Sequence, residues 1–168
     1  METELKKTVE EERFLADCML GRLAKWLRIL GYDTHYQRTY PWGAVHDPTS
    51  LEGRRLLTRC RDTWKAHPGS VFIRSDHIGG QLRQLQEEGW IRANTERAFH
   101  RCPVCNGVLV YADTESAREH VPEYVFYRHR PRFWKCPVCG RYYWHGTHRR
   151  RMRIQLEAWG LMGGKPDS

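Results

Sequence analysis

The stretch "FLADCMLGRLAKWLRILGYDT", residues 14–34, carries the clearest structural pattern in this chain. A short apolar run ends in one carboxylate, Asp17, and the apolar residues after it have the spacing of a helix. At about 100° per residue, an arc of about 120° holds five apolar side chains. These are Leu20, Leu23, Ala24, Leu27 and Leu30. The stretch predicts a strand at 12–16, a core-facing helix at 18–30 and a second strand at 33–37.

The rest of the first hundred residues continues this alternation of strand and helix. Residues 38–53 contain two prolines and two glycines, which indicates a loop. The apolar runs "RRLLTR" (54–59) and "SVFIRS" (70–75) are typical of buried parallel strands, and "HIGGQLRQLQEEG" (77–89) has helical spacing. We therefore predict a small α/β domain with a mainly parallel sheet over residues 13–97, behind a charged tail at 1–12.

Two similar blocks, "RCPVCNGVLVY" (101–111) and "KCPVCGRYYW" (135–144), introduce a different composition. Each carries a Cys-x-x-Cys turn followed by a β-rich run, which is the pattern of a zinc ribbon. Two copies in hairpin contexts argue against a redox pair, and four thiolates already fill a tetrahedral shell, so His145 and His148 are not needed as ligands. The predicted ligands of one structural zinc ion are Cys102, Cys105, Cys136 and Cys139.

The segments around the ribbon are less distinctive. Residues 112–131 are polar and predict a loop or a short helix, whereas 147–160 predicts a helix with Thr147 as its N-cap and Gly160 as its stop. We assign residues 98–160 to the ribbon and its basic segment, and 161–168 to a flexible tail.

Carboxylates follow three of the predicted strands. Asp17, Asp62 and Asp76 come just beyond the ends of the strands, and Asp33 lies at the start of the second strand. The carboxyl ends of neighbouring parallel strands meet at one edge of a sheet, where such folds bind ligands. An oxygen cluster of this kind suits Mg²⁺ or Mn²⁺, although each acid taken alone is equally well explained as a helix cap.

The formal net charge of +8 is concentrated in one region. Residues 101–153 hold 11 Lys and Arg against 4 Asp and Glu, and this asymmetry favours a polyanion such as RNA as partner. Cations on the flank of the first helix offer a second phosphate track or a solvated face. The candidate RNA-binding residues are Arg22, Lys25 and Arg28 on that helix, and His148, Arg149, Arg150, Arg151 and Arg153 near the C-terminus.

No stretch approaches the roughly 20 apolar residues of a membrane span. The N-terminal segment "METELKKTVEEER" has no apolar signal-peptide core. We therefore expect no membrane association and a cytoplasmic location.

Five segments of the chain together resemble the Mut7-C RNase domain family, from residue 14 to about 153. They are "FLADCMLGRLAKWLRILGYDT", "GRRLLTR", "SDHIGGQLRQL", "RCPVCNGVL" and "CPVCGRYYWHGTH". The resemblance implies a PIN-like nuclease fold with an appended zinc ribbon and metal-dependent RNase activity. It places the family's acids at Asp17, Asp33 and Asp76. One position departs from the family's pattern, because Cys60 stands after "LLTR" where an Asp is typical, and Asp62 follows two residues later.

The sequence patterns are consistent with three functions. The first is a metal-dependent endoribonuclease in which Asp17, Asp62 and Asp76 bind Mg²⁺ or Mn²⁺, with Asp33 nearby, while the ribbon and its basic segment hold RNA. The second is a module that binds RNA or a ribonucleoprotein without cleaving, in which Cys60 marks the loss of the site. The third is a protein–protein adaptor with Tyr142, Tyr143 and Trp144 as its contact residues.

Overall fold

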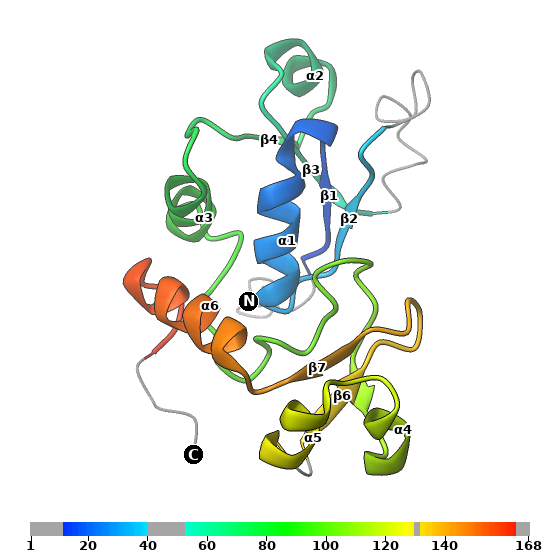
Figure 1. Ribbon diagram of the computed structural model, residues 1–168. Coiled ribbons are helices and arrows are strands. Elements are labelled where there is room, and N and C mark those ends of the chain that lie inside the picture. Colours follow the sequence, from blue (N-terminus) through cyan, green and yellow to red (C-terminus); the bar gives the residue numbers. More distant parts are fainter. Residues whose placement is uncertain (1–11, 40–52, 130–131, 164–168) are drawn as a thin grey trace, which may run out of the picture.

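A computed structural model describes residues 12–39, 53–129 and 132–163 (Figure 1). The charged tail predicted at 1–12 lies outside these residues except for Glu12. So do most of the loop predicted at 38–53 and the last five residues of the tail predicted at 161–168.

The first half of the chain forms an α/β unit around a four-stranded sheet. The strands are β1 (Phe14–Ala16), β2 (Thr34–Tyr36), β3 (Arg55–Thr58) and β4 (Val71–Phe72). Their order is β2-β1-β3-β4, and all neighbours are parallel, which confirms the predicted sheet. The helices are a 3-10 helix, η2 (Cys18–Leu20), followed by α1 (Gly21–Ile29), α2 (Arg61–Ala66) and α3 (Ile78–Glu87).

The apolar stripe of α1 explains why this unit folds. Leu23, Ala24 and Leu27 are fully buried against the sheet, next to Phe14 of β1. Burying a leucine side chain contributes about 1.5–3 kcal/mol, so the stripe fixes which face of the helix meets the core. At the end of the helix, Gly31 adopts φ +93°, and a Cβ there would lie 2.5 Å from the Arg97 carbonyl oxygen. The turn into β2 therefore requires glycine.

The cysteine-rich region forms a second, antiparallel sheet. Strands β5 (Val110–Tyr111), β6 (Phe133–Lys135) and β7 (Tyr142–Trp144) pair in that order. Between β5 and β6 the chain forms two short helices, α4 (Thr114–Arg118) and α5 (Glu123–His129), where a loop or one short helix was predicted. The side chains of Phe126 and Phe133 stack 6.1 Å apart and anchor a small separate core.

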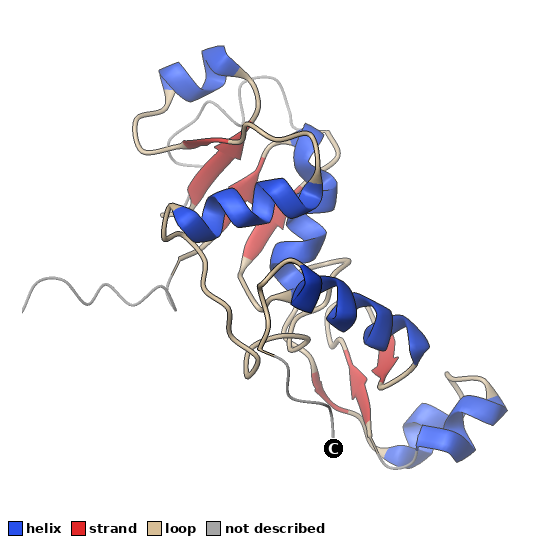
Figure 2. Ribbon diagram, turned by 90° about the vertical axis from the view of Figure 1, so that its left-hand side faces the viewer, coloured by secondary structure: helices blue, strands red, loops and turns tan. Residues whose placement is uncertain are grey.

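The last helix, α6 (Thr147–Ala158), leaves the ribbon and returns to the α/β unit. Leu156 and Leu161 are fully buried in the α/β core, and Trp159 meets Trp26 of α1 edge-to-face at 5.0 Å. Figures 1 and 2 show α6 lying between the parallel sheet and the ribbon. The expectation of a flexible tail from residue 161 is wrong for Leu161 and Met162, because both are buried.

Two local details differ from expectation. The helix α2 was not predicted, and α6 has Gly146 rather than Thr147 at its N-cap. Within the described part of the chain, none of the helices combines the length and apolarity that crossing a membrane requires.

Candidate metal centre and carboxyl-edge site

The four predicted zinc ligands meet at one point. The Sγ atoms of Cys102, Cys105, Cys136 and Cys139 all lie within 4.8 Å of one another. Cys102 and Cys139 are 3.7 Å apart, and Cys105 and Cys136 are 3.3 Å apart. A tetrahedral ion with Zn–S bonds of about 2.3 Å places its sulfurs about 3.8 Å apart. The donor set and its spacing therefore fit a structural zinc ion.

Each Cys-x-x-Cys turn is shaped by its own backbone. The Asn106 N–H donates to the Cys102 carbonyl at 3.0 Å, and the Gly140 N–H donates to the Cys136 carbonyl at 2.9 Å. Asn106 and Gly140 occupy equivalent positions and both have positive φ, +72° and +75°. The left-handed residue after the second cysteine turns the chain back, so that both thiols of a turn face the same side.

The surroundings shift the pKa values of two of these thiols in opposite directions. Burial disfavours the thiolate at Cys139, but hydrogen bonds from Arg141 and from neighbouring thiols outweigh it and lower the pKa of Cys139 to about 6. Burial raises the pKa of Cys105 to about 12 before any metal binds. The hydroxyl of Tyr143 lies 3.0 Å from Cys102 Sγ and can donate to a thiolate there.

The first cysteine turn docks on the amino-terminal edge of the parallel sheet. Asn106 Oδ1 accepts from the Thr34 backbone N–H at 3.0 Å, and its Nδ2 donates to Asp33 Oδ1 at 2.6 Å. Asp33 also accepts from Arg54 at 2.7 Å. Burial disfavours the Asp33 carboxylate, but the hydrogen bonds from Arg54 and Asn106 hold its pKa below the ordinary value.

This arrangement corrects the expectation that Asp33 lies near the other acids. In the parallel register Phe14 pairs with Thr34, so Asp33 precedes β2 at the opposite edge from Asp17, which follows β1. The difference arises because a strand start and a strand end lie at opposite edges of a parallel sheet. Asp33 ties the ribbon to the sheet through Asn106.

Arg28 is likewise a structural residue rather than part of an open phosphate track. Its side chain is buried, and its Nε donates to the Thr34 carbonyl at 2.9 Å. Its Nη1 donates to the carbonyls of Pro103 and Val104, at 3.2 and 2.9 Å, inside the first cysteine turn. The flank predicted to face solvent is covered here by the ribbon.

Asp17 occupies the carboxyl edge of the sheet, as predicted. It is 6% exposed, and its Oδ2 accepts from Thr58 Oγ1 at 2.7 Å. Its Oδ1 accepts from the Cys18 N–H at 2.6 Å, so it also caps η2. Thr58 is the last residue of β3 and was not singled out from the sequence; its place in "LLTRC" was the available signal.

The other acids share this edge but do not join Asp17. Asp62 is exposed in the first turn of α2, and Asp76 is exposed and paired with Arg59. Cys60 is the N-cap residue of α2, two residues after the end of β3, and hydrogen bonds from Thr63 and Asp62 lower the pKa of its thiol. Across residues 12–39, 53–129 and 132–163, the four cysteines form the only group of three or more acidic, His or Cys side chains within ligand distance.

One buried carboxylate still fits one mode of divalent-ion binding. Mg²⁺ is commonly held by one or two carboxylates together with substrate phosphates and water. The carboxylate of Asp17 accepts from the Cys18 N–H and from the Thr58 hydroxyl, and the exposed Cys18 thiol is a further hydrogen-bond neighbour that an ion could displace. The edge therefore fits an ion shared with a phosphate, rather than a complete cluster built from protein carboxylates.

The predicted basic residues fall into different environments. Arg22 and Lys25 are exposed on α1, as are His148, Arg150 and Arg151 on α6. In contrast, Arg149 lies over the Phe99 ring at 4.7 Å and the Trp134 ring at 5.4 Å. Arg153 pairs with Glu157 one turn along the helix at 3.1 Å. The arginines of α6 therefore do not form one exposed patch.

A cavity of about 540 Å³ lies where α1, the ribbon and α6 meet. Lys25, His148 and Arg149 line it, and so do Phe99, Arg101 and Trp134, which the sequence did not single out. The available signal for these three was the mixture of aromatic and basic residues that begins near residue 99.

These features define a class: an α/β protein with a parallel sheet and a docked four-cysteine ribbon that can hold zinc. Residues 12–156 match the Mut7-C RNAse domain family, and the chain belongs to that family. Comparison with curated proteins gave no match, and neither did comparison with solved structures.

Proposed function

We propose that this protein is a metal-dependent endoribonuclease of PIN-like type, with its reaction centre at the carboxyl edge around Asp17. The observation that carries the proposal is a buried aspartate at the ligand-binding edge of a parallel sheet, fixed by Thr58 at 2.7 Å. Membership of a family described as an RNase domain supports the same reaction class.

Three residues at this edge would have separate roles in RNA cleavage. Asp17 would hold a Mg²⁺ or Mn²⁺ ion together with a phosphate of the RNA, and Thr58 would keep the carboxylate oriented. A bound ion of this kind supplies charge neutralisation on the phosphate and a more acidic water molecule. Arg22 is exposed in the first turn of α1, next to this edge, and would contact the phosphate backbone.

The structural zinc site determines how the metal requirement must be tested. A strong chelator would also remove zinc and unfold the ribbon, so loss of activity in EDTA would be ambiguous. Zinc-loaded protein should instead be dialysed into buffer without Mg²⁺ or Mn²⁺ and assayed on single-stranded RNA while either ion is added back. We expect cleavage to appear only on addition.

The matched variant is Asp17→Asn, which keeps the shape and the capping ability but removes the charge. We expect it to fold, bind RNA at least as well as the wild type and lose more than about 100-fold in cleavage rate, the scale of a lost electrostatic contribution. The control is Asp62→Asn, exposed on α2 at the same edge. Cleavage that survives Asp17→Asn would refute the proposed centre.

A second candidate function is RNA or ribonucleoprotein binding without cleavage. Two observations favour it: Cys60 stands where the resemblance expects an acid, and Asp76 is paired with Arg59 instead of facing Asp17. Cys60→Asp separates the two candidates. If the wild type is inactive with either ion and Cys60→Asp is active, the natural chain is a binding module.

A further inference from the structure

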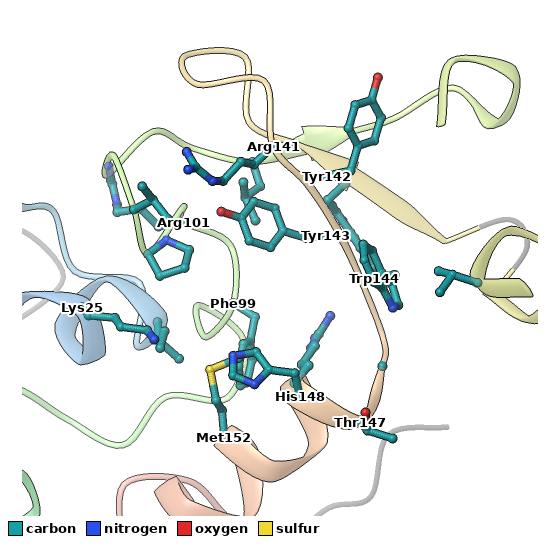
Figure 3. Close-up of a pocket in the computed structure, with 18 of the residues that line it drawn as sticks. Lys25, Phe99, Arg101, Arg141, Tyr142, Tyr143, Trp144, Thr147, His148 and Met152 are labelled. Atoms are coloured by element: carbon teal, nitrogen blue, oxygen red, sulfur yellow. The ribbon is translucent and has the colours of Figure 1, made fainter. Parts of the chain in front are cut away.

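The cavity between α1, the ribbon and α6 combines aromatic walls with a cationic rim (Figure 3). Its volume of about 540 Å³ falls within the range of small-molecule pockets, roughly 300–1,000 Å³. In Figure 3, Lys25 from α1, Tyr143 from β7, and His148 and Met152 from α6 converge on the same space. The space suits a single flat group rather than a helix or a folded domain.

The ribbon sheet presents a separate aromatic face to this cavity. Trp134 of β6 and Tyr143 of β7 are directly paired across the strands, so their side chains share one face of the sheet. The neighbouring pair, Phe133 and Trp144, lies on the opposite face. Phe133 is buried in the small ribbon core, whereas Trp144 packs against that core and also lines the cavity. The Trp134–Tyr143 face lies outside the small ribbon core. Because the Trp134 ring already stacks on His145 at 4.8 Å, Tyr143 is the ring of this pair that we assign to the ligand.

Phe99 adds a third aromatic ring, in an unusual backbone conformation. Its φ is +65°, a left-handed value that costs a non-glycine residue about 1 kcal/mol or more. Its N–H donates to the Ile29 carbonyl at 2.7 Å, which fixes the loop against the end of α1. The chain thus holds an aromatic side chain at the cavity wall at the cost of backbone strain.

The positive charge of the cavity rim indicates that its ligand is an anion. Lys25 and His148 are exposed, and Arg101, Arg128 and Arg141 also line the cavity. Arg101 is fixed at this rim, because its Nη1 donates to the Asn106 carbonyl at 2.7 Å. Aromatic rings beside cations match the two parts of a nucleotide: the base stacks and the phosphate pairs.

We propose that this cavity binds one unstacked base of single-stranded RNA, with Lys25 and the rim arginines contacting the adjacent phosphates. The inference rests on the proposed function and specifies its substrate: the RNA must be single-stranded where it enters the cavity. Between the carboxyl edge and the cavity wall at Ile29 lies α1, whose nine residues span an axial length of about 13 Å. The held base lies a few nucleotides from the cleaved bond, and Arg22 and Lys25 follow the path between them.

The experiment compares two oligomers of equal length and charge: oligouridine and an abasic ribose-phosphate chain. Binding is measured by fluorescence anisotropy on zinc-loaded protein without Mg²⁺ or Mn²⁺, so that cleavage plays no part. One stacked base contributes about 1–3 kcal/mol, so we expect the abasic chain to bind about 10- to 100-fold more weakly. Quenching of tryptophan emission by oligouridine alone provides a second readout on the wild type.

The matched variants are Met152→Trp, which fills the cavity from α6, and Ile154→Trp, which lies on the same helix but does not line the cavity. Met152→Trp should reduce oligouridine binding to the abasic level and leave abasic binding unchanged, whereas Ile154→Trp should keep the difference. Zinc content and circular dichroism establish that both variants fold.

The outcomes separate this inference from the proposed function. Equal binding of the two oligomers by the wild type overturns the base site and leaves the nuclease proposal intact. Base-dependent binding without any cleavage supports the site and refutes the nuclease. Failure to bind either oligomer overturns the base site, and the nuclease is then decided by the assay in which Mg²⁺ or Mn²⁺ is added back. Polyglutamate binding as tight as oligouridine would assign the cavity to an acidic peptide instead.

Discussion

Arg28 of α1 donates from its Nη1 to the Val104 carbonyl at 2.9 Å, inside the first cysteine turn. A buried cation on the main helix of one unit therefore satisfies carbonyls in the other. The backbone of the zinc site and the packing of α1 are held by the same side chain, so the two units are coupled in stability as well as adjacent in space.

The first prediction concerns this coupling. Arg28→Ala removes donors to three carbonyls, two of them in the cysteine turn. We expect a loss of about 3 kcal/mol in the free energy of unfolding, the scale of buried hydrogen bonds to a charged group. Arg22→Ala, exposed on the same helix, should change it by less than about 0.5 kcal/mol. Urea unfolding of zinc-loaded protein measures both, and equal effects would contradict the docking role.

The second prediction concerns zinc. Cys136→Ser removes a buried ligand, so we expect the zinc content to fall from one ion per chain to none. The amides of β6 and β7 should then exchange rapidly, and α1 should lose stability because Arg28 loses its ordered partners. The exposed Cys18 lies outside the cluster, and Cys18→Ser should keep its zinc. Elemental analysis with hydrogen exchange decides the matter; full zinc content in Cys136→Ser would exclude the four-thiolate site.

The third prediction is a pH dependence carried by Asp33. Its pKa in the folded protein is lowered, so its stabilisation is present above the unfolded pKa of about 3.9 and is lost as the pH falls through the folded value. Asp33→Asn should lower stability near neutral pH and lack this loss in acid. Zinc is released in acid from both proteins, so the informative quantity is the difference between their unfolding curves. A difference that stays constant below about pH 4 would exclude a role for the charge.

The fourth prediction concerns salt dependence. Arg150 and Arg151 are exposed, whereas Arg153 is paired with Glu157. If each exposed arginine contacts one phosphate of single-stranded RNA, replacing both with Gln should flatten the log–log salt slope by about 1.4. Arg153→Gln should leave the slope unchanged and cost about 0.3–0.5 kcal/mol of helix stability. A slope unaffected by the double variant would place the contacts elsewhere, most directly at Arg22 and Lys25.

Local patterns in the sequence were sufficient for most of the strands and helices and for the four-cysteine cluster. The stripe from Leu20 to Leu30 dictates the buried face of α1 because helical period is a local property. The paired Cys-x-x-Cys turns identify their own ligands because a four-sulfur shell needs all four thiols. Asp17 was placed at the carboxyl edge because the apolar strand ends immediately before it.

Local patterns could not predict how distant segments of the chain meet. Asp33 and Arg28 looked like site residues because sequence position reveals neither the opposite edge of a sheet nor a face later covered by the ribbon. Asp62 is separated from Asp17 because it lies in the first turn of α2, and Asp76 because it pairs with Arg59. The aromatic cavity exists because α6 packs beside the ribbon and α1. Periodicity and ligand chemistry are encoded in neighbouring residues, whereas burial and charge pairing arise from contacts between residues far apart in the chain. Neighbouring residues thus encode most of the strands and helices and the four-cysteine cluster, whereas packing between distant segments settles which charged side chains are exposed and which hold the two units together.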